Sequence, residues 1–347
     1  MTKLQYHPLR VAKVVEETAD TRSIELDVPA ELREAFRYKP GQHLTLHVPS
    51  GGKLLPRCYS LSSSPLLDEP LRFTARHTVD GRASGWLCGE LRAGDTLEVA
   101  PPAGVFTPRS LDSTMLMFAA GSGITPVFSI VRSVLGAGRG SIRLFYANRD
   151  ERSVIFAAEL ARLSREHPQR LQVVHWLESV QGTPSQAQLA AFARNGGADE
   201  HFICGPEPFM DAAAGALRDL GIADSQVHLE HFVSLPDDAD AVAAAAAPPP
   251  AAAAGEARIE ADIDGVMHTV TAYPGQLLIE ALEDAGLNPP FSCRAGACAA
   301  CMCKLEEGEV EMLTNHVLDQ GDLEQQWILA CQALPKTPLV RVRYARS

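Results

Sequence analysis

The chain has 347 residues, enough for two or three domains of ordinary size. Hydrophobic residues make up 46% and charged residues 21% of it, which excludes wholesale disorder and a fibrous repeat. The formal net charge of -12 argues against broad attraction to nucleic acid or anionic lipid, so we expect small molecules and proteins as partners. The only long uncharged run, 241–254, is Ala with three prolines and would insert poorly into a membrane. The amino terminus has no apolar secretory core, which favours the cytoplasm.

The first part of the chain, 1–110, has the pattern of short antiparallel strands. Alternating apolar and polar residues occupy 44–48, 71–79 and 95–100, and Pro and Gly turns separate them. This pattern predicts a small antiparallel β-barrel domain.

The second part, 111–233, alternates apolar strands with helical patterns. We expect strands at 114–120, 141–147, 171–177 and 201–205, and helices that begin at Pro126, at Ile155 and at Pro208. This alternation is typical of an α/β domain with a parallel sheet.

A linker and a third domain follow. The segment 234–257 is rich in Ala and Pro, has little to bury, and contains a triple proline that forbids a continuous helix. Residues 258–347 show short strands around one amphipathic stretch, 276–286, which predicts an α+β domain. This last domain holds 13 acidic and 7 basic residues, so its net charge of -6 is half of the total. Such a surface could steer a basic protein partner, or it could simply keep the domain solvated.

Five of the 8 cysteines lie in the last domain. Cys293, Cys298, Cys301 and Cys331 have the C-x4-C-x2-C…C spacing of a plant-type 2Fe-2S cluster, with Gly and Ala between the first three. The alternative is a zinc site, but zinc sites usually come as paired CxxC knuckles. Cys303 lies outside the pattern, and we interpret it as a buried strand residue rather than a substitute ligand.

A glycine loop follows the strand 114–120 and opens the next helix. Gly121 and Gly123 would let the backbone approach a pyrophosphate, Thr125 could cap the helix, and Pro126 suits its first turn. The loop lacks the third glycine of the dinucleotide fingerprint, so an ordinary strand-to-helix turn is the alternative. The segment 204–206, Cys-Gly-Pro, ends another predicted strand, at the edge where open parallel sheets bind ligands.

Two further segments, 57–62 and 81–87, have the residue types of a flavin site. The first, RCYSLS, combines an arginine for phosphate with an aromatic ring beside a hydroxyl, and the second is a Gly and Ser turn into a helix. On physical grounds alone, Tyr59 is more typical of a barrel core than of a cofactor stack.

Taken together, RxYS, GxxS, GSGITP, CGP and the cysteine pattern resemble the ferredoxin–NAD(P)H reductase superfamily in type and order. Within it, the chain is most similar to oxygenase reductases with a ferredoxin domain at the carboxyl end, such as those that serve phenylacetyl-CoA epoxidase and ketosteroid hydroxylase. The resemblance implies a β-grasp fold for the last domain and FAD as the flavin, with FMN less suited. It implies flavin contacts at Arg57, Tyr59, Ser60, Leu61, Gly81, Ser84 and Phe232, nucleotide contacts at Gly121, Gly123, Thr125, Pro126, Cys204, Gly205 and Pro206, and catalytic roles for Ser60, Cys204 and Glu230.

The implied function is transfer of electrons from NADH or NADPH through the flavin and the 2Fe-2S cluster to a partner oxygenase. Preference between the two nucleotides stays open, because Arg149 or Arg152 could meet a 2′-phosphate while Asp150 could hold a free ribose. The alternatives are a reductase for another redox protein, such as a hybrid-cluster protein, and a redox-sensing or zinc-binding regulatory module.

Overall fold

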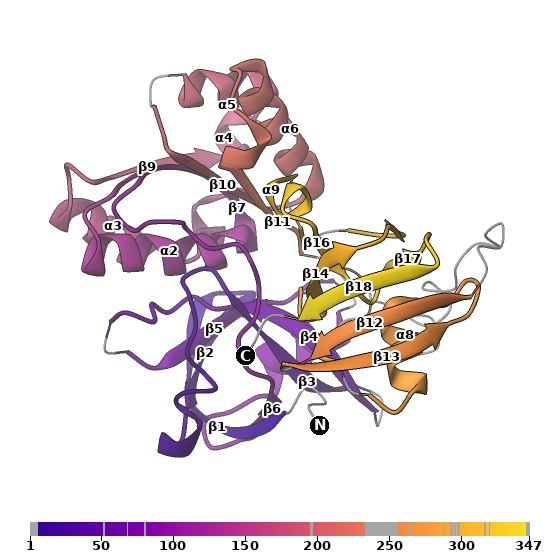
Figure 1. The fold of residues 1–347 in the computed structure, drawn as a ribbon. Coiled ribbons are helices and arrows are strands. Elements are labelled where there is room, and N and C mark those ends of the chain that lie inside the picture. Colours follow the sequence, from indigo (N-terminus) through magenta and orange to yellow (C-terminus); the bar gives the residue numbers. More distant parts are fainter. Residues whose placement is uncertain are drawn as a thin grey trace. The chain divides into compact units, whose positions relative to one another are not determined.

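A computed structural model describes the chain in two compact units, Tyr6–Phe232 and a second unit that begins after it (Figure 1). The described residues are 6–50, 53–67, 69–79, 81–194, 197–232, 256–263, 265–287, 289–291, 294, 296, 299–315, 317–318 and 320–344. Most of the predicted linker, up to residue 255, lies outside them. Among the described residues, no helix is long and apolar enough to cross a membrane.

The first unit begins with a six-stranded antiparallel sheet in the order β4-β3-β6-β1-β2-β5. Its strands are β1 (His7–Thr18), β2 (Thr21–Asp27), β3 (His43–Ser50), β4 (Lys53–Ser60), β5 (Leu71–Arg76) and β6 (Thr96–Val99), with η1 (Ala30–Leu32) and α1 (Arg82–Gly89) between them. A bridge between Leu61 and Phe73 joins the two outer strands and closes the sheet into the predicted barrel. Leu44, Leu46 and Val48 of β3 are fully buried because alternate side chains point into the barrel.

The second half of this unit is a parallel five-stranded sheet in the order β11-β10-β7-β8-β9. Its strands are β7 (Thr114–Ala120), β8 (Ser141–Asn148), β9 (Leu171–Leu177), β10 (Glu200–Cys204) and β11 (Val227–Glu230). Its helices are α2 (Ile124–Ala137), α3 (Ala157–Glu166), α4 (Glu178–Gln181), α5 (Gln186–Ala193) and α6 (Glu207–Asp219), with short turns η2 (Gly121–Gly123), η3 (Glu151–Ser153) and η4 (Asp224–Gln226). The predicted α/β class is confirmed, although α2 begins two residues before Pro126, α3 two after Ile155 and α6 one before Pro208.

Both faces of the parallel sheet are covered, which explains why its strands are continuous apolar runs. Met115 and Met117 of β7 face α2 and α3, whereas Leu116 and Phe118 face α5 and α6. Figure 1 shows these helix pairs on opposite sides of the sheet.

The barrel meets the parallel sheet along a buried boundary on α2. Ser129 Oγ donates to the Ser63 carbonyl oxygen at 2.6 Å and accepts from the Gly41 amide at 3.3 Å. The hydroxyls of Ser64 and Ser133 lie 2.7 Å apart in the same boundary. These hydrogen bonds satisfy polar groups that burial removes from water.

The second unit holds a five-stranded sheet in the order β13-β12-β18-β14-β16 and a two-stranded sheet of β15 and β17. The strands are β12 (Ala257–Ile263), β13 (Val266–Ala272), β14 (Met302–Glu307), β15 (Val310–Met312), β16 (Trp327–Leu329), β17 (Ala333–Pro335) and β18 (Leu339–Tyr344), and the helices are α8 (Leu278–Asp284) and α9 (Gln320–Glu324). Leu278, Ile279 and Leu282 are buried on one side of α8, which confirms the predicted amphipathic helix. Because β12 begins at Ala257, the predicted linker extends one residue too far.

Candidate functional site

The carboxyl ends of three parallel strands meet at one edge of the first unit. Cys204, the last residue of β10, pairs with Ala119 of β7 on one side and with Glu230, the last residue of β11, on the other. The predicted Cys-Gly-Pro segment and the predicted glycine loop therefore follow neighbouring strands. This is the edge at which open parallel sheets bind ligands.

The two glycines of the loop make room for protein atoms. A Cβ on Gly123 would lie 2.1 Å from the Cys204 carbonyl oxygen, so this glycine lets the loop lie directly on the Cys204–Gly205 peptide. Gly121 has φ +53°, and a Cβ there would lie 2.9 Å from Arg76 Nη1. Their predicted approach to a pyrophosphate stays a prediction. The backbone of residue 204 excludes a side chain at position 123, and the positive φ favours glycine at position 121.

The expectation that Thr125 caps α2 is wrong. The helix begins at Ile124, its N-cap is Gly123 without a side-chain cap, and Thr125 Oγ1 donates to the Ser122 carbonyl oxygen at 3.0 Å. A short 3-10 turn at Gly121–Gly123 leads directly into α2, so the helix begins earlier in the chain than predicted. Thr125 therefore lies inside the first turn instead of at the N-cap. Pro126 does lie in the first turn, as predicted.

The predicted flavin-ring residues lie on β4 and directly after it. Arg57 and Tyr59 share one face of the strand because they are two residues apart, and Leu61 is buried where the barrel closes. The Arg57 guanidinium donates to the Pro56 carbonyl oxygen at 3.0 Å. Ser60 is buried, and its hydroxyl has no hydrogen-bond partner among the described residues. A buried hydroxyl without a partner fits a bound group that carries hydrogen-bonding atoms, as a flavin ring does.

His43 brings the three predicted catalytic residues together. It is the β3 partner of Ser60 on β4, and its Nδ1 lies 3.8 Å from the Glu230 carboxylate. Glu230 in turn pairs with Cys204. His43 carries no signal in the sequence, because its position follows from the pairing of β3 with β4 and from a contact across the boundary, which no local pattern reveals.

Burial controls protonation in this group. It raises the pKa of Glu230 to about 7, although His43 lowers it in part, and Glu230 Oε2 has no hydrogen-bond partner among the described residues. Burial also raises the pKa of the fully buried Cys204 thiol. Near neutral pH, Glu230 can therefore hold a proton or release it, while Cys204 stays a neutral thiol. Phe232, the remaining predicted flavin contact, is 46% exposed.

Gly81 and Ser84 form the turn that starts α1. Gly81 is the N-cap, and Ser84 Oγ donates to its carbonyl oxygen at 3.2 Å and accepts from the Thr78 amide at 3.2 Å. A Cβ on Gly81 would lie 2.2 Å from Thr78 Oγ1, so the turn requires glycine. Both residues hold the start of a helix, where backbone amides favour an anion, and their contact with a pyrophosphate stays a prediction.

In the second unit, two of the predicted cluster ligands come together. Cys301 lies just before β14 and Cys331 between β16 and β17, and both side chains are buried. The hydrogen bond with Cys301 lowers the pKa of the Cys331 thiol. Cys293 and Cys298 lie outside the described residues. Two buried thiols facing one another fit half of a 2Fe-2S ligand set.

The backbone beside these thiols is unusual. Arg294 and Ala299 have φ of +53° and +52°, a conformation that L-residues rarely adopt, and Gly296 has φ +69°. Gln332 Nε2 donates to the Arg294 carbonyl oxygen at 2.8 Å, which ties this loop to the segment of Cys331. Cys303 is fully buried on β14 and pairs with Tyr344, so the interpretation as a buried strand residue fits its position.

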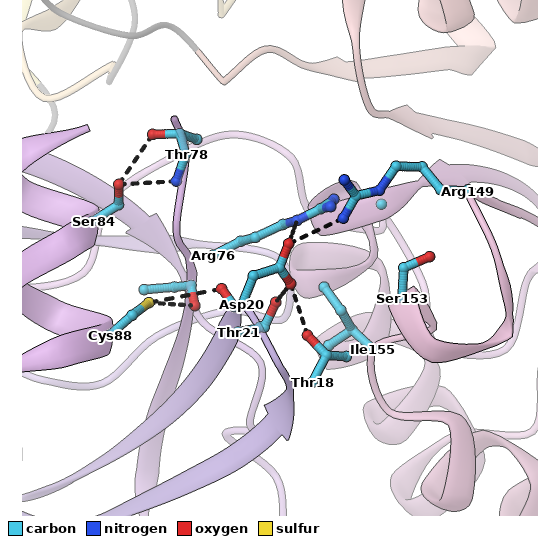
Figure 2. A network of polar contacts seen from close by, with 12 residues as sticks. Thr18, Asp20, Thr21, Arg76, Thr78, Ser84, Cys88, Arg149, Ser153 and Ile155 are labelled. Atoms are coloured by element: carbon cyan, nitrogen blue, oxygen red, sulfur yellow. Dashed lines mark hydrogen bonds and ion pairs between the residues drawn. The ribbon is translucent and has the colours of Figure 1, made fainter. Parts of the chain in front are cut away.

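The residues after β8 form a charged contact with the barrel (Figure 2). Arg149 Nη2 donates to Asp20 Oδ2 at 3.1 Å, and Arg76 Nε donates to the same oxygen at 3.0 Å. Asp150 Oδ1 accepts from the Ser153 amide at 3.0 Å and so caps its own turn. The choice between NADH and NADPH stays open.

Comparison with known proteins gives three matching family models. They are described as an oxidoreductase FAD-binding domain at residues 8–107, an oxidoreductase NAD-binding domain at 117–215, and a 2Fe-2S iron-sulfur cluster binding domain at 261–336. Each falls within one of the three predicted domains.

Relatives match over nearly the whole chain. The ferredoxin reductase component of 3-ketosteroid-9-alpha-monooxygenase from Rhodococcus rhodochrous is 49% identical over 97% of this chain and 96% of the relative. One subunit of 1,2-phenylacetyl-CoA epoxidase from Escherichia coli is 35% identical over 98% of both chains. The structure of phthalate dioxygenase reductase aligns with a TM-score of 0.59 over 98% of both chains at 23% identity, which shows the shared fold.

Proposed function

Because this chain belongs to the family of oxygenase reductase components that carry FAD-, NAD- and 2Fe-2S-binding domains on one polypeptide, we propose that it serves an oxygenase of the ketosteroid monooxygenase kind. The reaction is oxidation of NAD(P)H, with the electrons passed one at a time to the partner. The observation that carries the choice of partner is the 49% identity to a ketosteroid reductase component, against 35% to the matching subunit of an acyl-CoA epoxidase.

When bound, FAD would supply hydride acceptance from the nicotinamide, and the 2Fe-2S cluster would supply single-electron acceptance. The chain positions them. Arg57, Tyr59, Ser60 and Leu61 hold the flavin on the barrel, while Gly81 and Ser84 direct the start of α1 toward its pyrophosphate. Gly121, Gly123, Thr125, Pro126, Cys204, Gly205 and Pro206 shape the nucleotide edge, and Cys293, Cys298, Cys301 and Cys331 bind the cluster.

Within this proposal, Glu230 binds and releases a proton beside the flavin. Its carboxyl group is buried beside His43, and burial raises its pKa to about 7, so it holds a proton on Oε2 in a substantial fraction of molecules at neutral pH. The neutral Cys204 thiol and the Ser60 hydroxyl fill the same buried region without adding charge. Phe232, two residues after Glu230, covers the buried region of Cys204 and Ser60 at the end of the nucleotide domain.

We also place the protein in the cytoplasm. Cys58 and Cys88 of the barrel and Cys204 of the nucleotide sheet are not joined in disulfides among the described residues, which suits a reducing compartment.

The test uses the purified full chain under anaerobic conditions. Flavin and cluster absorbance, both bleached by NADH or NADPH, is the expected result, whereas a colourless zinc protein would overturn the proposal. The reduced chain is then supplied to the oxygenase component of the R. rhodochrous 3-ketosteroid-9-alpha-monooxygenase or to the remaining subunits of the E. coli epoxidase. We expect product with the first and little with the second, and the reverse would reassign the partner.

A further inference from the structure

The second unit contains one buried cysteine that the pattern of cluster ligands leaves over. Cys303 lies on β14 and pairs with Tyr344 of β18, and Figure 1 shows the two strands side by side. Directly paired residues of antiparallel strands point to the same face of a sheet, so the thiol and the phenol are neighbours. Cys303 is fully buried and Tyr344 is 3% exposed, so both side chains lie in the core of the unit.

The Tyr344 hydroxyl lies in the same buried region as two proposed cluster ligands. Burial raises the pKa of Tyr344 well above its usual value, and three neighbouring thiols raise it further. These are the thiols of Cys303, Cys301 and Cys331. The Cys301 carbonyl oxygen accepts from the Ala330 amide at 3.2 Å, which holds the segment of Cys331 beside the start of β14.

This hydroxyl is a buried donor without an acceptor in the described part of the unit. The Cys303 sulfur interacts with it, but a thiol is only a weak acceptor and the pair lacks hydrogen-bond geometry. Tyrosine carries its phenol proton at neutral pH, and a buried donor that stays unsatisfied is rare in native structures. The sulfur atoms of a 2Fe-2S cluster accept hydrogen bonds, so a cluster held by the neighbouring cysteines would supply the missing acceptor.

The residue type at position 303 keeps the hydroxyl available. A serine there would offer a strong acceptor and would engage the phenol O–H in a hydrogen bond of its own, whereas the thiol sulfur of Cys303 competes weakly. A buried cysteine also fills the core as a small apolar residue does.

We propose that the Tyr344 hydroxyl donates to a sulfur atom of the 2Fe-2S cluster and raises its reduction potential, and that Cys303 is the positioning residue that leaves this hydroxyl to the cluster. This rests on the proposed function. Reduction by the flavin adds one electron, and thus one negative charge, to the cluster, and a hydrogen bond donated to its sulfur becomes stronger. No covalent bond forms or breaks in this step, and the phenol proton stays on its oxygen.

The test is an anaerobic redox titration of the full chain loaded with flavin and cluster, followed by the electron paramagnetic resonance signal of the reduced cluster. Tyr344→Phe removes the donor and keeps the ring. We expect the equilibrium constant for cluster reduction to fall by about threefold, which is about 30 mV for a one-electron couple. Tyr273→Phe is the matched control, because Tyr273 is a 61% exposed tyrosine of the same unit, and its potential should equal that of the wild type. An unchanged potential in Tyr344→Phe at full iron content overturns the proposal.

Two variants of Cys303 test the positioning role. Cys303→Ser offers the hydroxyl a stronger acceptor, so the potential should fall about as far as in Tyr344→Phe, and the double variant should fall no further. Cys303→Ala offers no acceptor, so both the potential and the iron content should stay those of the wild type. Equal potentials in the serine and alanine variants overturn the proposal, also where Tyr344→Phe does not load a cluster. Loss of iron in Cys303→Ala would make Cys303 a ligand and would overturn it too.

Failure of the proposed function has a different signature. In that case the wild-type chain shows no cluster absorbance and no paramagnetic signal after reduction with dithionite. If only the role of Tyr344 is wrong, the wild type shows both, and Tyr344→Phe titrates at the wild-type potential.

Discussion

Two of the contacts between the barrel and the nucleotide sheet are built in different ways. Along α2, Ser129 bridges Ser63 and Gly41 in a buried boundary, and both of its hydrogen bonds are shielded from water. At the other contact, Asp20 and Arg149 meet at the surface. Loss of a hydrogen bond in the α2 boundary strongly lowers stability because the freed groups stay buried. Exposed ion pairs such as Asp20–Arg149 contribute little to stability.

The buried α2 boundary is thus a structural joint, whereas the exposed Asp20–Arg149 contact contributes little to stability. In the α2 boundary, the buried residues Ser63, Ser64, Ser129 and Ser133 find their hydrogen-bond partners within the chain, so these contacts hold the two halves together without a ligand. The Asp20 contact is an ion pair that solvent reaches, since the Arg149 side chain is 64% exposed. The following variants test whether stability divides in this way.

The largest effect concerns Glu230, whose contact with His43 also crosses the boundary. Burial raises its pKa from 4.5 to about 7, so the folded state binds this proton more tightly than the unfolded state. Stability that is fully present below about pH 4.5 is lost as the pH rises through about 7, by up to about 3 kcal/mol. Chemical denaturation across this pH range should show the loss in the wild type and not in Glu230→Gln. Glu166→Gln, on the exposed side of α3, should behave as the wild type. If the free energy of unfolding fell with pH equally in both variants, Glu230 would not be the group that causes the loss.

Next in size is Ser129→Ala. The change leaves the Ser63 carbonyl oxygen and the Gly41 amide buried without their partner, and we expect the free energy of unfolding to fall by about 2 kcal/mol. Thermal and denaturant unfolding measure it against Ser179→Ala, which removes an exposed hydroxyl. If the two variants were equally stable, the α2 boundary would not be the structural joint.

Arg132→Ala tests the charged part of the same boundary. Arg132 Nε donates to Glu69 at 3.3 Å and its Nη1 to Glu159 at 2.9 Å, and its side chain is 15% exposed. Removing it leaves two carboxylates without their shared partner, for an expected loss of about 1.5 kcal/mol. Arg162→Ala, from an exposed pair on α3, is the matched control and should cost under about 0.5 kcal/mol.

The smallest effect on stability is expected for Asp20→Asn. Both of its arginine partners reach solvent, so denaturant unfolding should show a change of less than about 1 kcal/mol in the free energy of unfolding. A stability loss as large as that of Ser129→Ala would erase the distinction between the two contacts.

The sequence predicted what depends on local pattern. β7 and β8 are apolar runs buried on both faces, and their bounds match the expected strands closely. The barrel, the parallel sheet and the helix at Leu278–Asp284 follow from periodicity alone.

Long-range contacts were beyond such patterns. His43 gains its role from strand register and Asp20 from the reach of a hairpin turn, and Asp20 is 129 positions away from Arg149 in the chain. The capping role given to Thr125 failed because a 3-10 turn shifts the helix start, a difference of two residues that propensity cannot resolve.

The contact between Gly123 and residue 204 engages a carbonyl oxygen, which every amino acid carries. The docking of the two loops therefore depends on the backbone of residue 204 and not on its side chain, whereas a Cβ at position 123 would collide with that backbone. The two positions are constrained in different ways: position 123 requires glycine, and position 204 is limited by the volume of the core in which its side chain is buried.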